Sequence, residues 1–175
     1  MKRFAKSNNI TFTAVFVAAS LIMFMVESLF PPLFIPGAKM GLSNIFSLLA
    51  LITLGVTQAY VVVIIKTILG AFITGSISTL TYSLPAGIIA ISLSVFLFCC
   101  LNNKISIVAI SVASATLHNI VQNIIYIFVS QTPQMSLYFP YLALVGVLAG
   151  AIVGISVALL QDFVNKIYFK TKRIM

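Results

Sequence analysis

TFTAVFVAASLIMFMVESL, residues 11–29, is an almost uninterrupted apolar run, and it leads into the proline-rich stretch PPLFIPGAKMGLSN, residues 31–44. A helix needs about 20 predominantly apolar residues to cross the hydrocarbon core of a bilayer, and the first run meets that requirement. The bases ahead of it suggest a signal peptide, but the run is long enough to span and no convincing small-x-small cleavage site follows. We therefore predict an uncleaved first transmembrane helix.

The composition extends this prediction to the whole chain. Of its 175 residues, 61% are apolar and 7% are charged, with ten Lys and Arg against two Asp and Glu. Soluble domains carry about a quarter of their residues as charged ones, so most of this surface must face lipid. We predict one all-α integral membrane domain covering residues 1–175. The net charge of +8 does not indicate nucleic acid, because most bases lie near the termini.

Hydropathy and helix breakers predict six transmembrane helices. The expected spans cover residues 11–29, 42–55, 58–74, 84–101, 105–129 and 138–161. The second span is short and adjoins the proline-rich stretch. We therefore expect part of that stretch to form a partly re-entrant first loop, with irregular backbone that protein covers at membrane depth.

The distribution of basic residues predicts the orientation. An even number of spans places both termini on one side of the membrane, and bases cluster at both ends of the chain. Lys104, in the loop between the fourth and fifth spans, falls on the same side, whereas the predicted outer loops 75–83 and 130–137 carry no charge. The positive-inside rule then makes both termini cytoplasmic. The clustered bases are these: Lys2, Arg3, Lys6, Lys166, Lys170, Lys172 and Arg173.

Three ionisable residues lie where charge is costly. A charged side chain at mid-membrane costs about 2.5–3.5 kcal/mol, so it usually faces a partner or a polar cavity. Glu27, near the outer end of the first span, and Lys39, in the following loop, form either a structural ion pair or part of a ligand pocket. Lys66, halfway along the third span, either snorkels to an interface or faces the same cavity.

The fifth span contains the segment ATLHNIVQNIIY, residues 115–126. A spacing of four places His118 and Gln122 on one helical stripe and Asn119 and Asn123 on the next. Such groups either bond neighbouring helices or face a ligand. Ser43 and Asn44 are candidate N-caps for the second span, whose positive end beside Lys39 favours an anionic group. The predicted ligand contacts are Glu27, Lys39, Asn44, Lys66, His118, Asn119, Gln122 and Asn123.

The sequence offers no catalytic centre. Its two acids, Glu27 and Asp162, are expected at opposite ends of the bundle, so no carboxylate cluster would hold Mg²⁺. No P-loop and no metal-spaced set of His and Cys is present, and Cys99 and Cys100 lack a second pair. We expect a protein that is not an enzyme and has no metal or cofactor.

Two patterns of small residues indicate close helix packing. Ala14 and Ala18 share one face of the first span, while Gly146, Gly150 and Gly154 form a stripe in the last. Small residues four apart allow helices to approach closely, either within one chain or between chains. For the glycine stripe, packing within the chain is the commoner arrangement.

Three segments together resemble one known family. PPLFIPGAKMGLSNIFSLLALITLG (residues 31–55), YSLPAGIIAISLSVFLF (82–98) and SVASATLHNIVQ (111–122) resemble the bacterial Gx transporters, often labelled heptaprenyl diphosphate synthase component I. That family is similar to the substrate-binding S components of energy-coupling factor (ECF) transporters. These are six-helix proteins of the cell membrane that capture micronutrients from outside.

The resemblance implies a function and partners. Residues 31–44 would close over an outer pocket holding a small anionic or amphipathic ligand. Ala14 and Ala18 would dock onto a transmembrane coupling subunit that two ATPases drive. The label of the family supports an alternative, a membrane accessory subunit of prenyl diphosphate or quinone synthesis in which the pocket holds an isoprenoid tail.

Overall fold

The computed structural model describes residues 2–29, 41–75, 77–101 and 104–174, with side chains described from residue 9 to residue 168 of these ranges. Every regular element in them is helical, which confirms the all-α prediction. The helices are α1 (Lys2–Leu29), α2 (Asn44–Thr53), α3 (Val56–Ile73), α4 (Ile77–Cys100), α5 (Ile107–Ser130), the 3₁₀ helix η1 (Pro133–Tyr138) and α6 (Phe139–Ile174). The predicted re-entrant loop falls largely on residues 30–40, outside the described ranges.

Five of the described helices are long and apolar enough to cross a membrane, and the short second span of the prediction corresponds to a sixth, shorter apolar helix. The five long helices are Asn9–Leu29, Val56–Ile73, Ile77–Cys100, Ile107–Ser130 and Pro133–Tyr168. The remaining helix, α2, has ten residues and therefore a length of about 15 Å, half the thickness of the hydrocarbon core.

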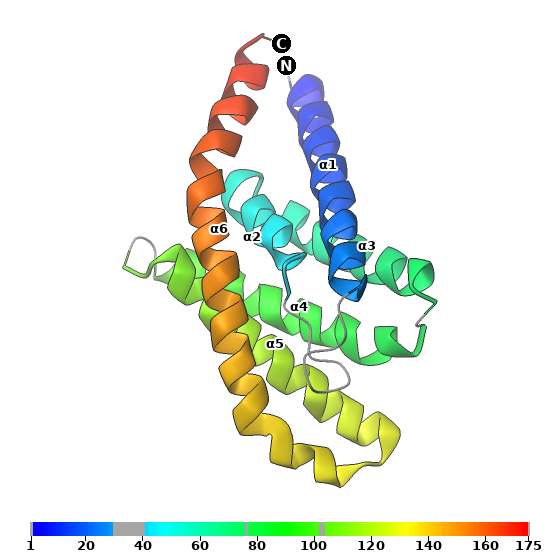
Figure 1. The fold of residues 1–175 in the computed structure, drawn as a ribbon. Coiled ribbons are helices and arrows are strands. Elements are labelled where there is room, and N and C mark those ends of the chain that lie inside the picture. The colour runs from blue at the N-terminus through cyan, green and yellow to red at the C-terminus, as the bar shows by residue number, and fades with distance from the viewer. Residues whose placement is uncertain (1, 30–40, 76, 102–103, 175) are drawn as a thin grey trace.

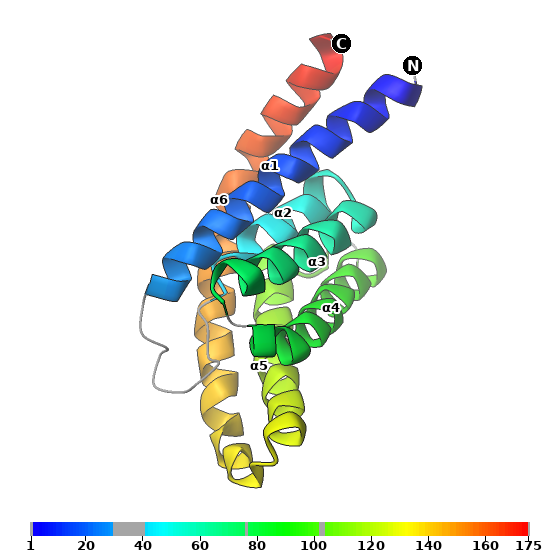
Figure 2. The same cartoon turned by 90° about the vertical axis from the view of Figure 1, so that its right-hand side faces the viewer.

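The two ends of the chain lie together, as the predicted even number of crossings requires. Figures 1 and 2 show the start of α1 and the end of α6 side by side at one end of the molecule. Here the Tyr168 hydroxyl donates to Asn9 Oδ1 over 2.7 Å, and the rings of Tyr168 and Phe12 meet edge to face at 5.2 Å. These two contacts join the N-terminal part of α1 to the C-terminal part of α6.

The short helix α2 forms the centre of the core. It packs against α1, α3, α4 and α6, and six of its ten residues are buried. Apolar side chains from the five other α-helices join it in one core, including Phe16 of α1, Val62 of α3 and Val157 of α6. The Ser20 hydroxyl of α1 donates to the carbonyl of Ser43, just before α2, over 2.8 Å. Polar residues at the start of α2 are consequently held inside the bundle.

Pro85 lies inside α4 and does not mark its beginning. The sequence predicted a loop at residues 75–83 and a helix from residue 84, but α4 begins at Ile77. That prediction was wrong because it treated the proline as a helix start. Transmembrane helices accommodate an interior proline when neighbouring groups satisfy the freed carbonyl. The seven extra helical residues bring Ser83 and Gly87 onto one helix that faces the interior.

The glycine stripe of α6 packs against α5, which confirms packing within the chain. The pair of α5 and α6 is the most extensive helix contact of the described fold. A Cβ added at Gly146, Gly150 or Gly154 would lie 2.5–2.6 Å from a Cα atom of α5. The two backbones are therefore in contact along three turns, where any side chain would force them apart.

Candidate functional site

A polar cavity, which we call the polar chamber, lies where five helices converge around the start of α2. It holds about 460 Å³ of atom-free space, its open side included. The five helices supply Glu27 (α1), Asn44 (α2), Lys66 (α3), Ser83 (α4) and Gln122 (α5). The other lining residues are Phe24, Gly41, Ser43, Val63, Thr67, Gly87 and His118. Five of the eight predicted ligand contacts thus lie around one cavity.

Lys66 points into the protein interior and does not snorkel. Its side chain is only 5% exposed. The ammonium group donates to Asn44 Oδ1 at 2.5 Å and to the Ser43 hydroxyl at 3.3 Å. Because a buried ammonium is stable only with good acceptors around it, these contacts explain how α3 carries a lysine at mid-span. The same contacts tie α3 to the start of α2.

Glu27 of α1 bonds the chain just before the start of α2. Its Oε1 accepts a hydrogen bond from the backbone N–H of Leu42 over 2.7 Å. Its Oε2 is buried and has no hydrogen-bond partner among the described residues. One carboxylate oxygen is therefore structural, while the other presents an unsatisfied acceptor to the polar chamber.

We expect Glu27→Ala to destabilise the protein and Glu27→Gln to be tolerated. Alanine leaves the partly buried Leu42 N–H without its acceptor, which costs about 1–3 kcal/mol, whereas the glutamine carbonyl still accepts that bond. Thermal unfolding of the purified protein in detergent compares the two variants. Equal midpoints for Glu27→Ala and the unaltered chain would show that the bond to Leu42 does not hold α2.

The two polar stripes of α5 face different neighbours. His118 and Gln122 line the polar chamber, where the Gln122 amide donates to the Ser83 hydroxyl at 3.4 Å. The Asn119 amide instead donates to the carbonyl of Leu142 in α6 at 3.3 Å. The Asn123 amide likewise donates to the carbonyl of Met135 in η1 at 3.0 Å. One stripe therefore faces the chamber, and the other bonds α5 to the chain that follows it.

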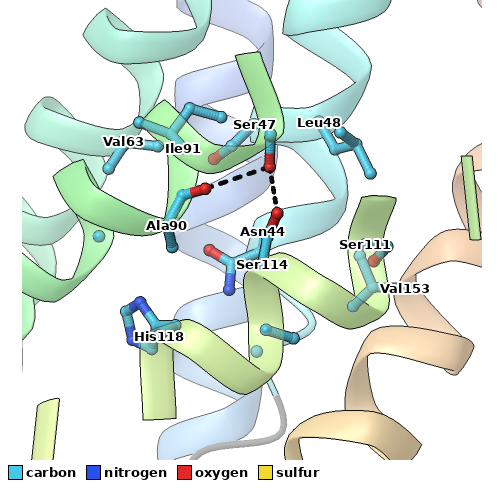
Figure 3. A pocket seen from close by; sticks show the side chains of 14 residues that line it. Asn44, Ser47, Leu48, Val63, Ala90, Ile91, Ser111, Ser114, His118 and Val153 are labelled. Atoms are coloured by element: carbon cyan, nitrogen blue, oxygen red, sulfur yellow. Dashed lines mark hydrogen bonds between the residues drawn. The ribbon is translucent and has the colours of Figure 1, made fainter. Parts of the chain in front are cut away.

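A second cavity, the serine slot, adjoins the polar chamber. Its fourteen lining residues include Ser47 of α2, Ser94 of α4, and Ser111 and Ser114 of α5, and Figure 3 shows side chains of these helices around a common space. The Ser94 hydroxyl lies 2.6 Å from that of Ser114 and 3.3 Å from the Ala90 carbonyl, the dashed lines in the figure. The two cavities share Gly41, Asn44, Val63, Gly87 and His118. They therefore adjoin along one common wall.

The sequence missed part of this lining. It did not single out Ser47, Ser83 or Ser94 as candidate site residues. One sequence pattern could have indicated this lining. Gly87, Ala90 and Ser94 are small residues spaced by three and four, so they share one face of a helix. Lys39, the other predicted contact from the first loop, lies outside the described residues.

Metal-binding groups do not gather in the described part of the chain. No three His, Cys, Asp or Glu side chains there lie close enough to hold a metal ion. Cys99 and Cys100 are exposed free thiols at the end of α4. The polar groups that converge in the chamber are one carboxylate, one ammonium, amides, hydroxyls and an imidazole. This set is suited to binding through hydrogen bonds.

The fold and the two cavities define a multi-pass, all-helical membrane protein with a polar chamber beside its central helix. A family model described as heptaprenyl diphosphate synthase component I matches residues 16–160. The chain belongs to this family, to which the Gx transporter label also refers, and the family prediction is confirmed. No curated protein and no solved structure matches the chain.

Proposed function

We propose that this chain is the substrate-binding membrane component of an ECF-type uptake transporter, and that it captures a small amphipathic molecule from outside the cell. The observation that carries the proposal is the polar chamber, in which Glu27, Lys66, His118 and Gln122 converge from three different helices. Buried polar residues from separate transmembrane helices are costly to maintain, and they commonly mark substrate sites.

The charges of the chamber favour an amphipathic ligand. Among the described residues, its lining contains one acid, Glu27, and one base, Lys66. Lys66 would bond an acceptor on the ligand, and the unpaired Oε2 of Glu27 would accept from a donor. No described lining residue of the adjoining serine slot is Asp, Glu, Lys or Arg, so this slot suits a less polar part of the same molecule.

The face of α1 that carries Ala14 and Ala18 supports a docking role. Both residues are exposed, while Thr13, Phe16 and Val17 on the opposite face are buried in the bundle. Small residues on an exposed transmembrane face let a second helix approach closely. In this proposal the second helix belongs to a transmembrane coupling subunit, which two ATPases drive. The termini lie in the cytoplasm of a bacterium, as the positive-inside rule favours.

Replacing Ala14 and Ala18 together with leucine is expected to block uptake and to leave ligand binding intact. The leucines project away from the core, so the chamber is unchanged. Their larger side chains prevent the close approach of a partner helix. Uptake by cells and ligand binding by the purified chain would be measured side by side. The control is Ile22→Leu, a change at another exposed position of α1. Normal uptake by the double variant would exclude this face as the docking surface.

The name of the family favours a second candidate, a membrane accessory subunit of prenyl diphosphate synthesis. In that case the serine slot holds an isoprenoid tail and a partner performs the chemistry. Copurification from the source cells in mild detergent separates the two. A membrane coupling subunit with an ATPase pair supports the transporter. A soluble synthase rich in aspartates, recovered in place of those subunits, would refute it.

A further inference from the structure

The Ser47 hydroxyl in the serine slot has no hydrogen-bond partner among the described residues. Three buried side-chain atoms of the described residues have no hydrogen-bond partner: Glu27 Oε2, Ser47 Oγ and Thr116 Oγ1. Thr116 belongs to the tight contact of α5 with Gly146, whereas the other two line the adjoining cavities. Ser47 is 2% exposed, so water at the surface does not satisfy its hydroxyl.

Two other hydroxyls of the slot, those of Ser94 and Ser114, bond each other and differ in this respect from Ser47. The Ser114 hydroxyl donates its proton to the Ile110 carbonyl over 2.8 Å. Ser94 then donates to Ser114, 2.6 Å away, because each hydroxyl has a single proton. Both donors are used within the bundle. Ser47, on the facing helix α2, retains its proton and its lone pairs for a partner that enters the slot.

The described lining of the slot disfavours charge. None of its fourteen described lining residues is Asp, Glu, Lys or Arg, and Leu48, Val63, Ile91 and Val153 form its apolar walls. An ionised group placed there would lose its hydration without gaining a counter-charge. A purely hydrocarbon group would fit the walls but would leave the Ser47 hydroxyl buried and unpaired.

We infer that Ser47 determines specificity by pairing with a hydrogen-bonding heteroatom on the uncharged end of the ligand, so that the slot rejects groups made only of hydrocarbon. The inference rests on the proposed function, because it describes the substrate of the same site. The polar end of the molecule occupies the polar chamber, and its uncharged, hydroxyl- or carbonyl-bearing end occupies the serine slot. Sites built to pair a ligand polar group discriminate strongly against analogues that lack it.

The test uses two probes of nearly equal size, 4-fluorophenol and 4-fluorotoluene, which differ by a hydroxyl in place of a methyl group. Fluorine NMR measures the affinity of each for the purified full-length chain in detergent. We expect Ser47→Ala to weaken 4-fluorophenol binding by at least about tenfold and to leave 4-fluorotoluene binding unchanged or tighter. Ser156→Ala, on α6 outside the slot lining, serves as the matched control.

The outcomes are decisive in both directions. Equal binding of 4-fluorophenol by the Ser47→Ala variant and the unaltered chain would overturn the inference. Tighter binding of 4-fluorotoluene than of 4-fluorophenol by the unaltered chain, or no binding of 4-fluorophenol, would also overturn it. Ser47→Ala removes an unpaired hydroxyl and should fold, which its thermal midpoint verifies. Ser47→Thr, which keeps the hydroxyl, is expected to retain a preference for 4-fluorophenol.

This experiment is independent of the transport test. It uses the chain alone, without a coupling subunit or ATPases. If the probe affinities agree with the prediction but a soluble synthase copurifies, the role of Ser47 stands and the transporter proposal fails. If the coupling subunit copurifies but Ser47→Ala does not change the affinity for 4-fluorophenol, the transporter proposal stands and the inferred substrate class fails.

Discussion

Gly150→Ala is expected to destabilise the protein by about 2 kcal/mol or more, although it adds a single carbon. The new Cβ would lie 2.5 Å from Val112 Cα and 2.9 Å from the carbonyl oxygen of Ser111. Both are backbone atoms of α5, so no side-chain rotation relieves the clash. The two helices must separate, and α5 carries His118 and Gln122 into the polar chamber. A lower thermal midpoint in detergent and weaker ligand binding should therefore appear together.

Val147→Leu provides the matched control for this substitution. It adds one carbon to the same helix, but at a position that is 45% exposed. Its thermal midpoint should stay close to that of the unaltered chain. An unchanged midpoint for Gly150→Ala would mean that α5 and α6 are not in backbone contact, and the position of the chamber would then have to be revised.

Lys66→Met is expected to reduce ligand affinity by about 30-fold or more, since losing one partner of a buried charged contact costs about 2–5 kcal/mol. Methionine matches the length and apolar stem of lysine but has no donor. Asn44 Oδ1 and the Ser43 hydroxyl lose the bonds they accept from Lys66. Removal of the buried charge offsets part of that loss in folding stability. The main effect should consequently fall on binding.

The measurement compares thermal midpoints with and without a small-molecule extract of the source cells. The extract should raise the midpoint of the unaltered chain and not that of Lys66→Met. Lys104→Met, which changes an exposed lysine between α4 and α5, should respond as the unaltered chain does. A full response by Lys66→Met would show that this ammonium does not contact the ligand.

The sequence predicted the features that depend on local pattern. Apolar runs of spanning length identified α1, α3 and α5, and the spacing of four identified the glycine stripe of α6. It also separated the stripe of His118 from that of Asn119. Which stripe faces a cavity depends on the rotation of α5 about its axis, and only the packing of Gly146 and its neighbours against α5 fixes that rotation.

Features set by tertiary packing were beyond the sequence. Pro85 reads locally as a helix start, and only the surrounding bundle allows α4 to begin at Ile77. The ten residues of α2 look like a weak membrane span, yet they form the buried centre of the core. Because Ser47 lies on that helix, its hydroxyl could not be assigned to a cavity from the sequence.

The most direct test of the polar chamber as a binding site is native mass spectrometry of the chain purified from its own membranes in mild detergent. We predict a population that carries a non-covalent small-molecule mass, and that Lys66→Met loses this mass while Lys104→Met retains it. A chain that carries no bound small-molecule mass, under conditions that preserve the fold, would contradict the account. So would a bound mass that persists undiminished in Lys66→Met.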